Sequence, residues 1–213
     1  MVQPIAGLDS NTGAGYDNGP LEQYCNSLKA KYIPNKRVLL IQIPQSILQS
    51  FNPEVARKRG YYAFPPTGLQ YLYQSLQGRD LDIRILDLNF LLLKRVFEDQ
   101  SFDHNQWVTI LEDYLETFDP YIIGVSCMFD AGIKPLIQIL DFLNRRDQSM
   151  IISGGVVSTY EWQNLIGCDL CHFVIKGEAE NKLNYLFDHL TDETRGHVAT
   201  PGIHFKFLQD LQE

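Results

Sequence analysis

Two cysteines and a histidine that lie close together in the sequence could bind a haem or a metal ion. Cys168, Cys171 and His172, in the stretch CDLCHFVIKGEAE, form the CxxCH pattern of covalent c-type haem attachment. A zinc site would need further ligands, and the other four histidines do not supply them at a matching spacing. In a second interpretation, the stretch leads into a buried strand, HFVIKG, and the informative part is the GEAE that follows.

The composition is that of a globular domain without a nucleic-acid partner. The chain has 213 residues, of which 45% are hydrophobic and 21% charged, and this length favours one domain with extensions over two domains. The formal net charge is -8 and no basic run is present. Binding to a phosphate backbone is therefore not expected.

The sequence contains no targeting or membrane signal. No apolar stretch approaches the roughly 20 residues of a membrane span, and the N-terminus lacks a charged region followed by an apolar one. We therefore expect a cytoplasmic protein whose four cysteines are mostly reduced thiols. Because covalent haem attachment normally follows export, this expectation disfavours the haem interpretation.

Three regions differ in character along the chain. Residues 1–35 are rich in Gly, Asn, Ser and Pro and are predicted to form a flexible N-terminal arm with one possible short helix. Residues 36–192 carry the regular apolar patterns of a folded domain. Residues 193–213 are a C-terminal extension in which GIHFKF is a possible short strand.

The folded domain alternates strand and helix patterns five times. Its apolar runs are KRVLLIQIP, DIRILDL, YIIGVS, MIISGG and HFVIKG. Between them lie stripes at helical spacing, such as Leu69, Leu72 and Leu76. This alternation predicts an α/β fold, a flavodoxin-like (Rossmann-like) five-stranded parallel sheet of order 2-1-3-4-5 with helices on both faces.

Ligands of such sheets bind outside the carboxyl ends of the strands, which makes the residues after each strand the candidate site. These residues are Pro44, Gln45, Ser46, Ser126, Cys127, Met128, Gly154, Gly155, Val156, Gly177, Glu178 and Glu180.

The glycine pair at residues 154 and 155 has two interpretations. It either lets a ligand approach the bare backbone or makes a tight turn into the next helix. Ser126 could hydrogen-bond a ligand or a local turn, and Asp87 a ribose hydroxyl or, more often, the start of a helix. No GxGxxG follows the first strand and no Walker loop is present, which disfavours a dinucleotide or a nucleoside triphosphate.

The order of these elements resembles a known family. VLLIQIP is followed by YYAFPPTGLQYL, ILDLN, IIGVSCMF, ISGGVVST and VIKGEAE. In this order they resemble the cobalamin-binding domain at the N-terminus of cobalamin-dependent radical S-adenosylmethionine enzymes. The resemblance runs from about Lys36 to about Leu190 and assigns residues 36–192 to that domain.

The resemblance implies that cobalamin lies over the strand ends, with its nucleotide tail reaching into the sheet edge. Ser126 and Met128 match the SxL element of the family, Gly154 and Gly155 its GG element, and the turn at residues 177–180 its GExE element. The carboxylates of that turn have two interpretations: they contact the ligand or, more often, they favour the dipole of the following helix. The implied partner is a radical S-adenosylmethionine domain, in cis or in trans, which would hold the iron-sulfur cluster and S-adenosylmethionine.

The sequence also departs from related families. The DxHxxG element of other cobalamin domains is absent, so no histidine after the first strand can serve as lower ligand, and cobalamin is expected base-off. Tyr61, Tyr62 and Phe64 line the corrin face or simply pack. No CxxxCxxC motif is present, so the chain alone is not expected to be catalytic, and residues 193–213 would lead toward a missing catalytic domain.

The same alignment places the CxxCH group at the entrance of the fifth strand, opposite the ligand edge, where packing thiols are expected. The leading hypothesis is therefore a cobalamin-binding module. The alternative is a stand-alone flavodoxin-like interaction or sensor domain without a cofactor, and the third hypothesis is a haem protein.

Overall fold

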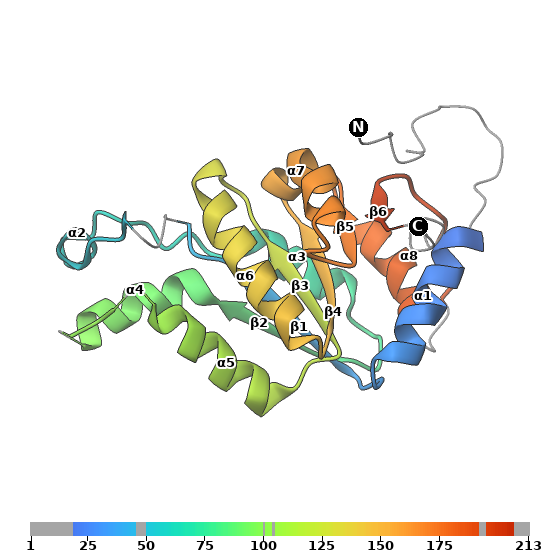
Figure 1. Ribbon diagram of the computed structural model, residues 1–213, viewed down its shortest axis with the longest axis horizontal. Coiled ribbons are helices and arrows are strands. Elements are labelled where there is room, and N and C mark those ends of the chain that lie inside the picture. The colour runs from blue at the N-terminus through green and yellow to red at the C-terminus, as the bar shows by residue number, and fades with distance from the viewer. Residues whose placement is uncertain (1–18, 46–49, 100, 104, 192–194, 207–213) are drawn as a thin grey trace.

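A six-stranded β-sheet in the order β2-β1-β3-β4-β5-β6 forms the centre of the protein (Figure 1). The computed structural model describes residues 19–45, 50–99, 101–103, 105–191 and 195–206. The strands are β1 (Arg37–Gln42), β2 (Asp82–Asp87), β3 (Ile122–Ser126), β4 (Met150–Gly154), β5 (Phe173–Ile175) and β6 (Ile203–Phe205). The first five strands are parallel and have the predicted order. The possible short strand in GIHFKF is β6, which pairs antiparallel with the edge of β5 and adds a sixth strand to the five predicted parallel ones.

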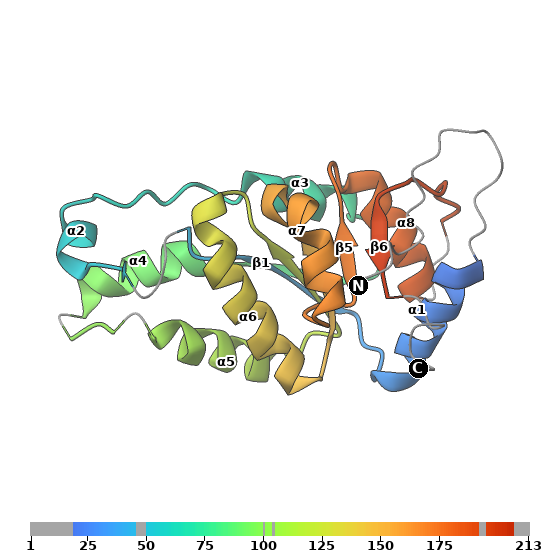
Figure 2. The same ribbon diagram turned by 45° about the horizontal axis from the view of Figure 1, so that its top comes forward.

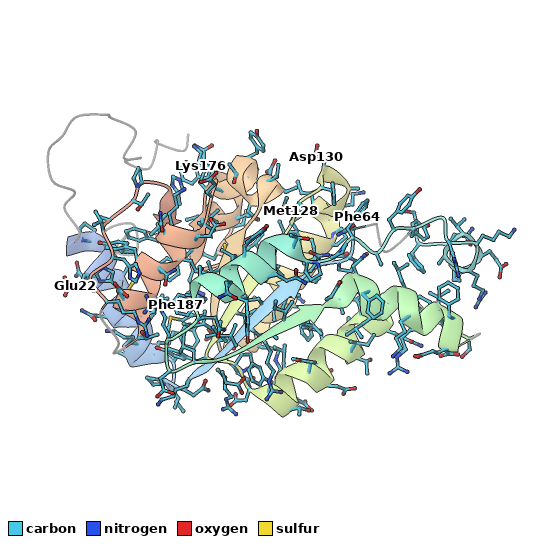
Figure 3. The ribbon with its side chains drawn as sticks, turned by 180° about the vertical axis from the view of Figure 1, so that it is seen from behind. Glu22, Phe64, Met128, Asp130, Lys176 and Phe187 are labelled. Carbon is cyan, nitrogen blue, oxygen red and sulfur yellow. The ribbon has the colours of Figure 1, made fainter. Side chains whose placement is uncertain are left out.

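Helices cover both faces of the sheet, as predicted. They are α1 (Gly19–Lys31), α2 (Pro53–Arg57), α3 (Thr67–Ser75), α4 (Leu88–Glu98), α5 (Gln106–Phe118), α6 (Ile133–Arg146), α7 (Val156–Gly167) and α8 (Glu180–Leu190). Figures 1 and 3 view the molecule from opposite sides, with α6 and α7 in front in Figure 1 and α3 in front in Figure 3. None of the helices in the described part of the chain is long and apolar enough to span a membrane.

Apolar residues on both sides of β1 create two core layers. Leu39 and Ile41 pack with α4, α5, α6 and α7 on one face. Val38 and Leu40 pack with α1, α3 and α8 on the other. Successive side chains of a strand point to opposite faces, so a continuous apolar run is what a strand covered on both sides requires.

Part of the expected flexible N-terminal arm is a packed helix. α1 buries Tyr24, Cys25 and Leu28 in the core layer that contains β5 and α8. Tyr24 also stacks on Phe205 of β6, with 5.4 Å between the ring centroids. This apolar stripe fixes residues 19–31 to the sheet, whereas residues 1–18 lie outside the described residues. The division into domains itself stays a prediction.

Candidate functional site

The register of the parallel strands places three terminal residues in one row. Gln42 of β1 pairs with Ser126 of β3, and Ser126 pairs with Gly154 of β4. Each of them is the last residue of its strand. The chain order reverses between β1 and β3, which is where open α/β sheets bind ligands. We call this edge the crest (residues 42–45, 126–129, 154–156 and 177–180).

A hollow of about 220 Å³ opens to solvent at the crest between β1 and β3. It is lined by Gln42, Ile43, Pro44, Gln45, Ser126, Cys127, Met128, Phe129 and Gly132. The structure thus brings together five of the predicted site residues at the ends of the first and third strands. Ser46, the other predicted residue after β1, lies outside the described residues.

The two glycines after β4 have different roles. A Cβ added to Gly154 would meet no atom within 4 Å, so the space beside its backbone is open. A Cβ added to Gly155 would lie 2.5 Å from the carbonyl oxygen of Cys127, and the φ angle of Gly155 is +93°. The turn interpretation is therefore confirmed for Gly155, and the ligand interpretation stays a prediction for Gly154. Gly155 makes the turn, and Gly154 leaves bare backbone toward the crest.

Cys127 joins the ends of β3 and β4 and is not a reactive thiol. Its N–H donates to the carbonyl of Gly154 at 3.1 Å, and its carbonyl accepts from the N–H of Val157 at 3.2 Å. Burial raises the pKa of the thiol to about 11, although a hydrogen bond from the backbone of Phe129 opposes the shift. The thiol is therefore protonated near neutral pH, as is expected of a buried cysteine.

Thr159 connects the two glycine motifs, and the sequence interpretation missed it. Its hydroxyl donates to the carbonyl of Gly155 at 3.0 Å and accepts from the N–H of Gly177 at 3.0 Å. One residue in the first turns of α7 therefore holds the turn after β4 to the turn after β5. A hydroxyl that follows a strand-ending glycine by four or five residues is the sequence signal that could have indicated this role.

The turn after β5 is organised by a lysine rather than by its carboxylates. The ammonium of Lys182 donates to the carbonyls of Lys176 and Glu178, at 2.6 and 2.9 Å. Ala179 occupies the N-cap position of α8 and its side chain makes no cap. Glu178 and Glu180 are exposed, and Glu180 lies in the first turn of α8, where the helix dipole favours a negative charge.

Exposed apolar side chains border the crest. Met128 is 48% exposed and Val156 43%, on either side of the Ser126–Gly154 pair. Phe64, from the loop before α3, lies 5.6 Å from Phe129 between ring centroids. Figure 3 shows Phe64 and Met128 at the same end of the sheet. Large apolar side chains gathered beside a hollow are typical of a surface that binds another molecule.

Other candidates near the crest have structural roles. The carboxylate of Asp87 accepts from the N–H of Phe90 at 2.9 Å and caps α4, the more common of its two predicted roles. Burial raises the pKa of Asp87, although hydrogen bonds to backbone amides oppose the shift. Tyr61 stacks on Phe51 at 4.9 Å and therefore packs, whereas Tyr62 is 72% exposed.

The histidine of the CxxCH group lies at the opposite end of the sheet. We call this end the foot (residues 31–37, 119–122, 147–150 and 168–172). Nδ1 of His172 accepts from the N–H of Ile151 at 2.9 Å, and Nε2 lies 3.0 Å from the hydroxyl of Tyr32. That hydroxyl donates to Asp147 at 2.7 Å, so Nε2 carries the proton and donates to Tyr32. Both ring nitrogens are occupied, which leaves none for a metal ion or a haem.

The two cysteines of this group do not form a binding pair. Cys168 is exposed, whereas Cys171 is buried and burial raises its pKa to about 12. Within the described residues, no group of three or more His, Cys, Asp or Glu side chains is arranged to hold a metal ion. The environment of Cys171 agrees with the expected packing role and opposes the haem interpretation.

The fold is shared with part of a solved enzyme. No protein-family model matches the sequence, and no curated protein matches it. One similar structure is the radical S-adenosylmethionine methyltransferase TsrM from Kitasatospora setae, solved with cobalamin and a [4Fe-4S] cluster. It aligns with a TM-score of 0.58 and a sequence identity of 18%. The alignment covers 83% of this chain and 30% of that chain. The structure of the same enzyme with tryptophan substrate and the analogue aza-SAM aligns with a TM-score of 0.57 and a sequence identity of 17%. This alignment covers 82% of this chain and 29% of that chain.

A more distant likeness is to a cobalamin-binding protein from Desulfitobacterium hafniense DCB-2, with a TM-score of 0.47 and 12% identity over 74% of this chain and 60% of that chain. This likeness is too weak to support an argument. The chain spans less than a third of the length of TsrM. At these identities the comparisons establish that this protein has the flavodoxin-like fold found in part of TsrM.

Proposed function

We propose that this chain is a cobalamin-binding module that carries the corrinoid on its crest. The observation that carries the proposal is the open backbone at Gly154, which lies beside Ser126 at the switch in strand order and between exposed Met128 and Val156. The ordered sequence motifs point to the same ligand. The solved TsrM structures, which share the fold, add support because one of them contains cobalamin.

The size and chemistry of the crest fit a ligand that is only partly enclosed. The hollow is shallow, because its volume of about 220 Å³ includes open solvent and its enclosed part has room for only about one water molecule, so most of a corrinoid would lie outside it. The bare backbone of Gly154 and the small Ser126 would accept the nucleotide tail. Met128 and Val156 would contact the apolar surface of the ligand.

An orphaned acceptor in the hollow also fits an amide-rich ligand. Oε1 of Gln45 is buried and has no hydrogen-bond partner in the described part of the chain. An unsatisfied buried polar atom costs about 1–3 kcal/mol. The amide side chains of a corrin are donors that would satisfy it, and Glu178 and Glu180 provide further acceptors at the far end of the crest.

We further propose that the bound cobalamin is base-off and has no histidine as lower ligand. No histidine occurs within residues 42–45 or 126–129, and His172 lies at the foot. The protein would contribute binding and orientation, while bound cobalamin would supply methyl-transfer or radical chemistry. An iron-sulfur cluster and S-adenosylmethionine would belong to a separate radical S-adenosylmethionine domain, in cis or in trans.

Reconstitution with hydroxocobalamin tests the proposal. The purified chain is incubated with the ligand and desalted, and we expect a cobalamin absorption spectrum to elute with the protein. Reduction to cob(II)alamin should then give an electron paramagnetic resonance spectrum without the splitting that a nitrogen lower ligand causes. A protein fraction free of cobalamin would reject the module, and nitrogen splitting would reject only the base-off state.

Gly154→Trp and Gly167→Trp are a matched pair for locating the site. Both glycines have open space around an added Cβ, but Gly167 lies at the other end of α7. We expect Gly154→Trp to abolish cobalamin binding with little loss of stability, and Gly167→Trp to retain binding. Equal effects of the two substitutions would place the site elsewhere.

The exposed apolar side chains of the crest also favour a second candidate, an interaction or sensor domain without a cofactor. An apolar surface of this kind can bind a protein as well as a corrinoid. The reconstitution experiment separates the two, because the second candidate has no cobalamin affinity for Gly154→Trp to remove.

A further inference from the structure

A segment before α3 crosses the crest without regular secondary structure. Residues Gly60–Pro66, which we call the aromatic strap, run from α2 toward α3 (Figure 2). The carbonyl of Tyr62 lies at the start of α4, directly after β2, and that of Phe64 at the end of β1. The ring of Phe64 then meets Phe129 after β3. The aromatic strap therefore borders the ends of three neighbouring strands.

Two buried amide side chains fasten the aromatic strap. Nε2 of Gln42 donates to the carbonyl of Phe64 at 2.9 Å, and Nδ2 of Asn89 donates to the carbonyl of Tyr62 at 3.2 Å. Oδ1 of Asn89 accepts from the N–H of Gln45 at 3.1 Å, so this side chain also holds the loop after β1. Gln42 is only 7% exposed and Asn89 5%.

The backbone of the aromatic strap is held while its rings remain in solvent. Tyr62 is 72% exposed and Phe64 is 49% exposed, although the backbone carbonyl of each residue is hydrogen-bonded to a buried amide. The rings of Tyr62, Phe64 and Phe129 form a chain with 5.6 Å between successive centroids. A buried amide costs free energy unless it is hydrogen-bonded. Apolar side chains at these two positions would hold a loop by packing and would need no hydrogen-bond partner. The two amides instead fix where the carbonyls lie, and with them the direction of the exposed rings.

We propose that Gln42 and Asn89 are positioning residues that clasp the aromatic strap, so that Tyr62, Phe64 and Phe129 form a fixed apolar wall against which a corrin ring packs. The inference rests on the proposed function and adds which side of the crest holds the macrocycle. A wall ordered before binding loses less conformational entropy when the ligand arrives, and this increases affinity. Neither amide touches the ligand in this arrangement.

Replacing each amide by the isosteric acid tests the clasp through its pH dependence. In Gln42→Glu and Asn89→Asp, the oxygen that replaces the amide nitrogen can donate to the strap carbonyl only when the acid is protonated. Burial raises the pKa of such a carboxyl group. We expect cyanocobalamin affinity to fall about tenfold at pH 8, the equivalent of one neutral hydrogen bond at the upper end of its usual range, and to recover toward pH 5. The wild-type affinity should stay flat over this range.

Two controls separate the clasp from other effects. Gln77→Glu makes the same charge change at an exposed position after α3 and should bind like the wild type. Phe64→Ala should weaken binding at every pH, whereas Phe97→Ala, which removes a ring that is 58% exposed on α4, should not. Because Phe64 is half exposed, its truncation keeps the test decisive even where an acid variant fails to fold.

The possible outcomes distinguish the two proposals. A wild-type chain that binds no cyanocobalamin overturns the proposed function and the clasp together. A wild-type chain that binds, with Gln42→Glu and Asn89→Asp equally tight at pH 8 and pH 5, overturns the clasp alone. Limited trypsin cleavage after residues 57–59 gives a ligand-free readout, and it should be faster in both acid variants at pH 8 than in Gln77→Glu.

Discussion

The crest and the foot are the two ends of one sheet, and they differ in the surroundings of Gly154 and His172. At the foot, both ring nitrogens of His172 are hydrogen-bonded, and Tyr32 bridges that ring to Asp147. At the crest, Gly154 faces open space and Oε1 of Gln45 has no partner among the described residues. A fully satisfied network stabilises the fold, whereas open backbone and an orphaned acceptor are available to a ligand.

The difference follows from the direction of the strands. In a parallel sheet all loops that leave the strands gather at one end, and the return loops at the other. The loops at the crest include the long connection that carries α2 and the aromatic strap. The foot has short returns, such as the one from α6 to β4, in which Asp147 adopts a positive φ of 48°. Room alone does not separate the two ends, because a hollow of about 250 Å³, lined in part by Asp119, Arg146 and Ser149, also opens at the foot.

The largest expected effect on stability lies within the crest itself, where the fold requires a glycine at residue 155 but not at residue 154. Gly155→Ala places a Cβ 2.5 Å from a backbone oxygen, at a φ of +93° and ψ of -179° that is almost restricted to glycine. Adding ~1–3 kcal/mol for backbone strain and ~1–3 kcal/mol for overpacking, we expect a loss of about 4 kcal/mol in unfolding free energy, measured by urea denaturation.

Gly154→Ala is the matched control for that prediction. Its new methyl group meets nothing within 4 Å, so we expect a change within about 0.5 kcal/mol, as for surface substitutions. Similar losses for both substitutions would show that Gly154 also serves the fold, and would remove the contrast between the two glycines.

The second expected effect is at the foot, where acid should destabilise the protein through His172. Burial, followed by the charge of Lys31, lowers the pKa of His172 to about 4. The unfolded chain binds the proton near its ordinary pKa of ~6.5. The contribution of the neutral ring is therefore complete above pH 6.5 and lost as pH falls toward 4, by on the order of 3 kcal/mol.

His172→Asn removes this titration while it keeps an oxygen that can accept from the N–H of Ile151. The variant should be less stable than the wild type at pH 7, but its stability should fall less between pH 6.5 and 4. Urea denaturation at a series of pH values measures both curves. Parallel curves would mean that other groups cause the acid sensitivity of the wild type.

Much of the sheet could be predicted because its signals are local. The run VLLI has apolar residues for both core layers, and its alternation requires only the geometry of a strand. β6 was predicted only as a possible strand and without its pairing, since three half-buried residues of an edge strand have no strong pattern. The packing of α1 was missed because residues rich in Gly and Asn before it dominate the composition of the N-terminal region.

The candidate site could be predicted only where a residue type has one dominant use. A glycine pair after a buried strand indicates a turn or a ligand; Gly155 makes the turn, and a ligand contact at Gly154 stays a prediction. Gln42 and Asn89 act through hydrogen bonds to segments that are distant in sequence, and an amide has no spacing that reveals such a partner. The CxxCH pattern misleads for a different reason. Its spacing matches that of haem attachment, but in the fold its histidine is hydrogen-bonded at both ring nitrogens and one of its cysteines is buried.

The third expected effect compares the two cysteines of the foot. Cys171→Ser buries a hydroxyl in place of a thiol that is 7% exposed, and an unsatisfied polar group costs about 1–3 kcal/mol. Cys168→Ser changes an exposed side chain and should leave stability within about 0.5 kcal/mol. Thermal denaturation of the reduced proteins measures both. A large effect at Cys168 would indicate a role that its exposed position does not explain.

The smallest expected effects compare one carboxylate from each end of the sheet. Asp147→Asn weakens the exposed pair with Lys31, at 2.6 Å, so unfolding free energy should fall by about 0.2–1 kcal/mol while cobalamin affinity stays unchanged. Glu178→Gln should do the reverse. It leaves stability unchanged, because the side chain is exposed, and weakens cobalamin binding about threefold, which corresponds to ~0.7 kcal/mol. Titration calorimetry measures the cobalamin affinity of both variants, and urea denaturation measures their unfolding free energies. A loss of affinity in Asp147→Asn, or a loss of stability in Glu178→Gln, would contradict the separation of a binding end from a stabilising end.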